Sequence, residues 1–196
     1  MGFALGGADS FLDFVEAEVR PFVKDLFRDE GLEVGKEAFW GHSFGGLCVL
    51  HSLITGKGGN FAWYYTVSPS IWWGQEYIFK EEENLQEMPN TQLTMSYGSK
   101  ELPENLERGS EESSKGFRNK TSEAQDADHE ARLKLAKERA MGANIETLHQ
   151  RLTHVPAQGR AKLPGARVVI IEGEDHGTVS TVGLLRALTD FFSIGS

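Results

Sequence analysis

The chain has 196 residues, 39% of them hydrophobic, and a formal net charge of −9 at pH 7, which suits one acidic domain with its own core. This charge argues against a nucleic-acid binder or a protein held on anionic membranes, and no apolar run approaches the ~20 residues of a membrane span. The N-terminus is a poor signal peptide and the single cysteine, Cys48, cannot form an internal disulfide, so we expect a cytoplasmic protein without structural zinc.

The first 60 residues predict a helix, a strand and a second helix. Apolar residues at helical spacing begin near Ser10, and we expect Pro21 to kink this amphipathic helix and Gly31 to end it. Residues 37–41 form a short predicted strand that runs into a Gly-rich turn. Residues 44–54 are apolar enough for a buried helix.

The remaining strands alternate with helices. Predicted strands cover residues 61–67, 91–97 and 167–171, and a last amphipathic helix covers 182–192. Such alternation implies parallel crossovers and an α/β sheet. Residues 101–123 are polar and predict a solvated or flexible insertion, whereas residues 124–155 regain helical character. We therefore expect one domain, with about four strands in a mostly parallel sheet.

The motif Gly-His-Ser-Phe-Gly at residues 41–45 carries the chemical signal. It follows a predicted strand and precedes a predicted helix, the context in which a serine nucleophile is held on a sharp turn. Small residues on both sides let the neighbouring backbone approach, and the backbone N–H of Phe44 could donate to an oxyanion. The competing interpretation is an ordinary Gly-rich turn, which the context disfavours.

A serine nucleophile needs a base, and His176 is the best placed of the six histidines. It follows the last predicted strand, at the carboxyl edge where α/β sheets keep their sites. It also comes after the serine in the order typical of α/β-hydrolases. The side chain of His42 should point away from Ser43. His51 is expected to be packed or half exposed, and a solvated position is expected for His129, His149 and His154.

The acid that orients the histidine should follow the strand before the last one. Glu101 is the first carboxylate there, and Glu104 is a near competitor. Glu174 and Asp175 are close to His176 in sequence, which makes it harder for them to orient its ring.

Three other side chains near these elements have a functional and a structural interpretation. Trp72 and Trp73 follow a predicted strand, and they could line a substrate pocket, with His42, or serve as core and lid. Cys48 lies on the apolar helix after the serine, where a buried small hydrophobe is the usual role.

Four segments together resemble the Putative esterase family of α/β-hydrolases, which includes ferric-siderophore esterases and, more distantly, esterase D. They are FLDFVEAEVRPFVKDLF, GHSFGGLCVLHSL, FAWYYTVSPSIWWG and GEDHG, in that order along the chain. The resemblance implies a three-layer α/β-hydrolase sandwich with Ser43 as nucleophile and His176 as base. Glu101 stands where the family carries its acid, although some siderophore esterases are described as using a Ser-His dyad. The implied reaction is ester hydrolysis in an iron-chelating oligoester, without a cofactor.

The resemblance also implies that this chain differs from family members at its N-terminus. Family members have several strands before the first of these segments, including the loop with the second oxyanion donor. We therefore expect an N-terminally truncated hydrolase with an open sheet edge, feeble in catalysis and prone to self-association. The alternatives to a serine esterase are a non-catalytic remnant or binding module, and acyl transfer to an alcohol by the same residues.

Overall fold

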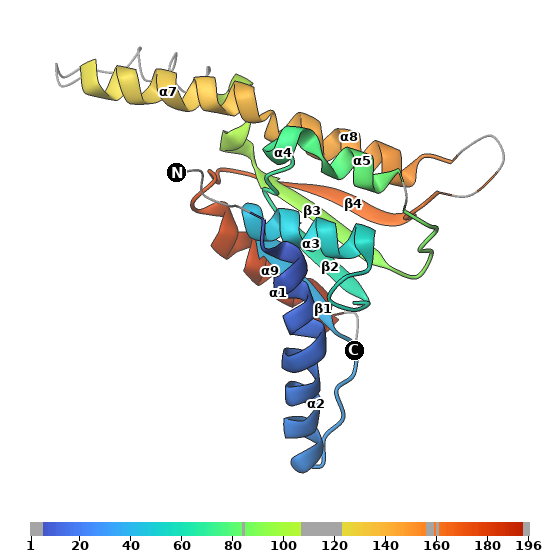
Figure 1. Ribbon diagram of the computed structural model, residues 1–196. Helices are drawn as coiled ribbons and strands as arrows, with labels where there is room; N and C mark the ends of the chain where they lie inside the picture. Colours follow the sequence, from blue (N-terminus) through green and yellow to red (C-terminus); the bar gives the residue numbers. More distant parts are fainter. Residues whose placement is uncertain (1–5, 84, 107–122, 156–158, 160, 194–196) are drawn as a thin grey trace.

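The computed structural model describes residues 6–83, 85–106, 123–155, 159 and 161–193, with the backbone alone for 123–128. At its centre lies a sheet of four parallel strands in the order β1-β2-β3-β4 (Figure 1). The strands are β1 (Ala38–His42), β2 (Trp63–Val67), β3 (Gln92–Gly98) and β4 (Gly165–Ile171). The predicted parallel α/β sheet is therefore confirmed, and the carboxyl ends of its strands meet at one edge.

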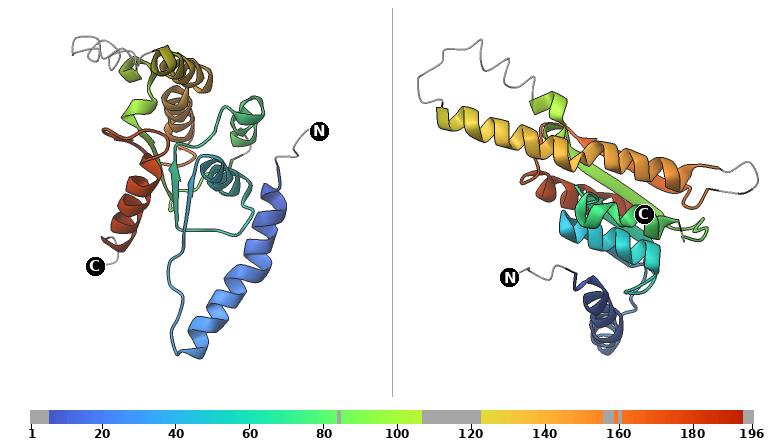
Figure 2. Two further views of the ribbon diagram at one scale, coloured as in Figure 1. Left: turned by 90° about the vertical axis from the view of Figure 1, so that its left-hand side faces the viewer. Right: turned by 45° about the horizontal axis from the view of Figure 1, so that its top comes forward.

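Helices cover both faces of the sheet, which confirms the three-layer architecture (Figure 2). One face packs against α3 (Phe44–Thr55), α5 (Ile78–Glu82) and α8 (Met141–Thr153), and the other against α9 (Val179–Ser193). The larger core joins fully buried side chains of these helices to β2 and β3: Leu50, Leu53, Ile78, Leu93, Met95, Ile145, Leu148 and Leu152. Burial on both faces explains why β2 consists of aromatic and β-branched residues.

Strand β1 lies at the edge of the sheet. It pairs with β2 on one side, and no described segment pairs with its other side. The strand is accordingly less buried than β2, and Ala38 at its start is exposed. Its outer N–H and C=O groups form an open edge of the kind that pairs with another strand.

The N-terminal helix is longer and more irregular than a single α-helix. It consists of α1 (Ala8–Phe14), a π-helical turn (Val15–Val19) and α2 (Arg20–Asp29), and Gly31 follows with φ +72°. Pro21 has no N–H to donate to the preceding turn, so the predicted distortion takes the form of this wider turn.

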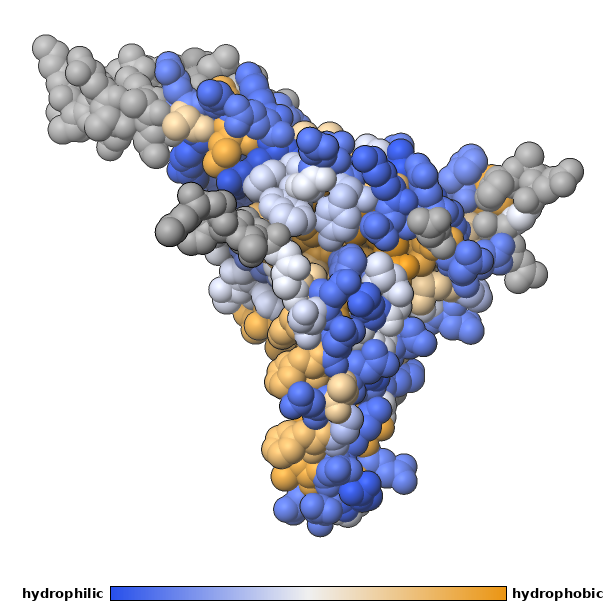
Figure 3. All heavy atoms as spheres, in the orientation of Figure 1, coloured by the Kyte–Doolittle hydropathy of each residue, from blue (hydrophilic) through white to orange (hydrophobic). Residues whose placement is uncertain are grey.

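The apolar stripe of this helix is mostly uncovered. Figure 1 shows α2 extending away from the sheet, and Figure 3 shows hydrophobic residues along its side. Leu12 is fully buried, but Phe22 is 67% and Leu26 is 52% exposed. The sequence therefore predicted the amphipathic pattern correctly, but among the described residues most of its apolar face has no covering partner.

The longest described helices between β3 and β4 are α7 (Glu123–Arg139) and α8, separated by Ala140 with φ +44°. This confirms the helical character predicted for residues 124–155. Of the predicted polar insertion, residues 107–122 lie outside the described residues. The short helices α4 (Trp73–Glu76), α5 and η2 (Ser99–Glu101) were not predicted. No described helix is long and apolar enough to cross a membrane.

Candidate active site

Ser43 occupies the sharp turn between β1 and α3. Its backbone angles, φ 57° and ψ −118°, are unusual for a residue with a side chain, and strain of this kind is concentrated at functional sites. Gly41 is essential to the turn, because a Cβ atom there would lie 2.3 Å from the carbonyl oxygen of Gly45. The backbone thus doubles back tightly and presents the serine hydroxyl at the carboxyl edge of the sheet.

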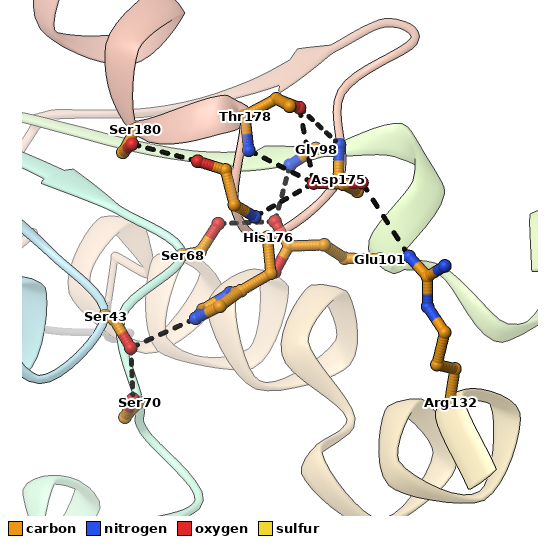
Figure 4. Close-up of polar contacts among 11 residues, drawn as sticks. Ser43, Ser68, Ser70, Gly98, Glu101, Arg132, Asp175, His176, Thr178 and Ser180 are labelled. Carbon is orange, nitrogen blue, oxygen red and sulfur yellow. Dashed lines mark hydrogen bonds and ion pairs between the residues drawn. The ribbon is translucent and has the colours of Figure 1, made fainter. Parts of the chain in front are cut away.

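Three side chains that the sequence singled out lie in contact at this edge (Figure 4). The Oγ atom of Ser43 is 3.1 Å from Nε2 of His176, and Nδ1 of His176 is 2.8 Å from Oε2 of Glu101. The three residues follow β1, β4 and β3. Because parallel strands end at the same edge, residues up to 133 positions apart in sequence come together here.

Glu101 is held by more than the histidine. Its other carboxylate oxygen, Oε1, accepts hydrogen bonds from the hydroxyl of Ser68 at 2.5 Å and the N–H of Gly98 at 2.9 Å. Burial raises the pKa of Glu101, but the hydrogen bonds from His176, Ser68 and Gly98 outweigh this effect, so its pKa lies below the usual value. The carboxylate is therefore charged at neutral pH although it is only 9% exposed.

The loop that carries His176 is fastened to the segment that carries Glu101. The N–H of Lys100 donates to the carbonyl of Glu174 at 3.0 Å, and the N–H of Gly173 donates to the hydroxyl of Ser99 at 2.9 Å. Gly98 permits this approach, because a Cβ there would lie 2.3 Å from the same Glu174 carbonyl. These contacts fix the imidazole beside the carboxylate.

The competing carboxylates are placed differently. Asp175 accepts hydrogen bonds from the N–H groups of Gly177 and Thr178. Among the described residues, neither Glu104 nor Glu174 forms a side-chain hydrogen bond or ion pair with His176, whose Nδ1 faces Glu101. The prediction that residues from 101 onward form a solvated loop is wrong at its first residue, because Glu101 is buried in η2.

Two serines near Ser43 were missed by sequence analysis. Ser68 anchors Glu101, and Ser70 places its Oγ 3.3 Å from Oγ of Ser43. Ser70 is only 2% exposed, and its N–H donates to the carbonyl of Ser43 at 3.1 Å. Both belong to the segment Ser68-Pro69-Ser70 after β2, where a run of small polar residues at the carboxyl end of a strand could have drawn attention.

The first turn of α3 offers a donor for an oxyanion. Phe44 is the first residue of this helix, and the first N–H groups of a helix have no acceptor within it. The positive end of the helix therefore faces the region where charge develops during acyl transfer.

His42 lies beside the catalytic candidates, but no hydrogen bond joins it to Ser43 among the described residues. Its ring centre is 4.7 Å from that of His176. The pKa of His42 is lowered, mainly by burial and to a smaller extent by the nearby His176. This favours a neutral ring in this position.

Aromatic side chains form a cluster next to Ser43. The ring centre of Phe44 lies 5.9 Å from that of Trp72 and 6.3 Å from that of Trp73, and both tryptophans are half-buried. The guanidinium of Arg139 stands 5.0 Å from the ring centre of Trp72. The sequence left a pocket and a lid or core role equally open. Trp73 packs against the larger core, whereas Trp72 lies between Phe44 and Arg139.

The remaining candidates lie away from this contact network. Cys48 is half-buried rather than fully buried, and burial raises the pKa of its thiol. His51 is bound to Asp9 at 2.7 Å. His149 corrects the sequence prediction, because it is not solvated but half-buried, with Nε2 3.1 Å from the carbonyl of Ala166. His129 is also half-buried, whereas His154 is exposed as expected. The described part of the chain contains no cluster of three or more side chains suited to a metal ion.

Comparison with known proteins supports the resemblance seen in the sequence. A family model described as "Putative esterase" matches residues 3–156. The chain is 36% identical over 194 residues to the siderophore triacetylfusarinine C esterase of Aspergillus fumigatus, covering 95% of this chain and 59% of that protein. It is 36% identical over 182 residues to the siderophore enterobactin esterase of Emericella nidulans, covering 90% of this chain and 53% of that protein.

Solved structures give the same result. The siderophore hydrolase EstA from Aspergillus nidulans superimposes with a TM-score of 0.76 at 30% identity, covering 100% of this chain and 61% of that structure. The chain thus spans little more than half the length of the relatives that it matches.

Proposed function

Because the chain belongs to the Putative esterase family, we propose that it hydrolyses carboxylic esters through an acyl-enzyme formed on Ser43. The observation that carries this proposal is the continuous set of contacts from Ser43 through His176 to Glu101. A serine next to an imidazole that a buried carboxylate orients is the arrangement that activates a hydroxyl at neutral pH.

Each residue has a defined task in this mechanism. Glu101 accepts a hydrogen bond from the Nδ1–H group of His176. Nε2 is then free to take the proton of Ser43 as the serine oxygen attacks the ester carbonyl. The N–H of Phe44 stabilises the oxyanion. His176 then returns the proton to the leaving alcohol, and a water molecule activated by the same imidazole releases the acid.

We further propose that the substrate is an ester of a siderophore, since the relatives named above act on such compounds. The iron of such a substrate is cargo, and no metal takes part in the proposed steps. The aromatic rings of Phe44, Trp72 and Trp73 would receive the acyl portion.

A weakly active or non-catalytic binding module is the second candidate. It is favoured because Phe44 is the one oxyanion donor that we assign among the described residues, and removal of one such donor from other enzymes costs about 2.7–4 kcal/mol of transition-state stabilisation. The proposed esterase would on that basis turn over slowly. Acyl transfer to an alcohol uses the same residues, and product analysis would separate it from hydrolysis.

The test is covalent labelling of the purified chain with a fluorophosphonate, which reacts with activated serines. We expect labelling that is absent in Ser43→Ala and strongly reduced in His176→Ala, while Ser193→Ala, an exposed serine on α9, labels normally. Circular dichroism establishes that each variant is folded. A folded wild-type chain that does not label would favour the binding module.

A further inference from the structure

A pocket of about 120 Å³ opens beside His176, between α7, η2 and the loop after β4. We call it the α7 pocket. The pocket is lined by Glu101 and His176, and by Arg132, Leu135 and Arg139 of α7. An engineered cavity of about 150 Å³ in another protein binds benzene, so the α7 pocket has room for a small part of a substrate.

Cations dominate the part of this pocket that is free to bind a ligand. Lys100, Arg132 and Arg139 line it, in a protein whose formal net charge is −9. The two carboxylates of the pocket are already engaged. Glu101 accepts three hydrogen bonds, and Asp175 accepts two backbone N–H groups that lower its pKa.

The cations differ in how far they are neutralised. Arg132 lies 3.7 Å from Asp175 (Figure 4). Lys100 and Arg139 have no carboxylate within salt-bridge distance among the described residues. Arg139 is also pre-oriented, because its guanidinium stacks over the ring of Trp72 beside the nucleophile. A guanidinium held in this way loses little freedom when it binds a planar anion.

The chemistry decides which part of an ester would enter this pocket. His176 must protonate the leaving oxygen, so the alcohol portion of the substrate lies on the imidazole side of Ser43. The α7 pocket is on that side, since His176 itself is one of its walls. The aromatic cluster of Phe44, Trp72 and Trp73 remains for the acyl portion.

We propose that the α7 pocket selects esters whose alcohol portion carries a carboxylate, and that Arg139, with Lys100 and Arg132, binds that group. The proposal rests on the esterase function and adds a substrate class to it. In a linear oligoester of hydroxy acids, the terminal unit with the free carboxylate is the alcohol portion of the last ester bond. The pocket would therefore favour linear oligoesters over cyclic ones. A preceding ring-opening hydrolysis must supply these linear oligoesters.

The test uses two esters that share an acyl group, the butanoates of 4-hydroxybenzoate and of 4-hydroxybenzamide. Arg139→Gln should lower the ratio of kcat/KM for the carboxylate ester to kcat/KM for the amide ester about tenfold, corresponding to about 1.4 kcal/mol. Arg139→Lys should retain part of the preference. Added salt should weaken the preference, because the pocket is open to solvent.

Lys134→Gln is the matched control. Lys134 lies on the same helix, its side chain is 77% exposed, and it does not line the pocket. This variant removes one positive charge from α7 and should leave both esters unaffected. If it changed the ratio of the two rates as much as Arg139→Gln, the effect would be long-range and the proposed binding site would be wrong.

Binding measurements separate this proposal from the esterase function. NMR titration of the Ser43→Ala variant should show tighter binding of 4-hydroxybenzoate than of 4-hydroxybenzamide, and addition of Arg139→Gln should abolish the difference. Such a result without turnover by the wild type would refute the esterase function and support carboxylate binding in the α7 pocket. The opposite outcome is turnover of both esters with an unchanged rate ratio in Arg139→Gln, together with equal binding of the two phenols. This outcome would refute carboxylate binding in the α7 pocket and support the esterase function.

Discussion

Replacement of Glu101 by glutamine would separate the charge of this side chain from its shape. The two oxygens of the carboxylate face only donors. Oε1 accepts from the N–H of Gly98 and the hydroxyl of Ser68, and Oε2 faces Nδ1 of His176 at 2.8 Å. A glutamine must turn its NH₂ group toward one of these positions.

The fixed backbone decides the orientation of that amide. The N–H of Gly98 cannot rotate away, so the amide oxygen must take the Oε1 position and the NH₂ group must face His176. The imidazole then has to accept at Nδ1 and carry its proton on Nε2. In this tautomer it cannot take the proton of Ser43, 3.1 Å away.

We therefore expect Glu101→Gln to lower kcat by about 10³- to 10⁴-fold, since the corresponding acid-to-amide change in a serine protease costs about 10⁴-fold. Hydrolysis of 4-nitrophenyl butanoate measures the rate, and ¹⁵N NMR of the imidazole reports the tautomer. Glu101→Ala is the control, because it removes the carboxylate without imposing a tautomer and should be less damaging. A glutamine variant that keeps a tenth of the activity, with Nε2 still unprotonated, would refute this argument.

Three further predictions concern folding and assembly. Gly41→Ala forces a Cβ to within 2.3 Å of a backbone oxygen and should destabilise the fold by about 1–3 kcal/mol in urea unfolding, whereas Gly45→Ala, with open space around its Cβ, should leave the fold intact. The hydrogen bonds from Arg20 lower the pKa of Glu37 below its ordinary value. The stabilisation that they give the fold is therefore present above about pH 4.5 and is lost as the pH falls through the lowered pKa. Glu37→Gln should remove this part of the pH dependence when unfolding midpoints are measured from pH 7 to 3. The open edge of β1 should make the chain self-associate as its concentration rises, which light scattering measures. Ala38→Pro removes an N–H from that strand and should reduce the association. A wild-type chain that stays monomeric at high concentration would contradict this prediction.

The local signals in the sequence were sufficient for much of the fold. The pattern of β-branched and aromatic runs located all four strands because each is bounded by Gly, Pro or polar turns. The nucleophile turn was recognisable because only a glycine fits at position 41, where the backbone doubles back. The candidates for the acid and the histidine then followed from the chain order typical of α/β-hydrolases.

Other features depended on contacts between distant segments. The sequence left Glu104 beside Glu101 as candidates for the acid, and the bonds from Lys100 and Gly173 that join the two loops single out Glu101. The burial of His149 was mispredicted because its helix pattern did not reveal which side faces β4.

By itself, the sequence determined the strand–turn–helix that presents Ser43, because the steric limits of a tight turn and the alternation of apolar residues are local properties. Only the tertiary structure decided which groups surround that serine. Ser68, Ser70 and Arg139 reach the site from segments whose composition alone gives no direction. Their roles arise because four parallel strands bring their following loops to one edge, where distances of a few ångströms set the chemistry.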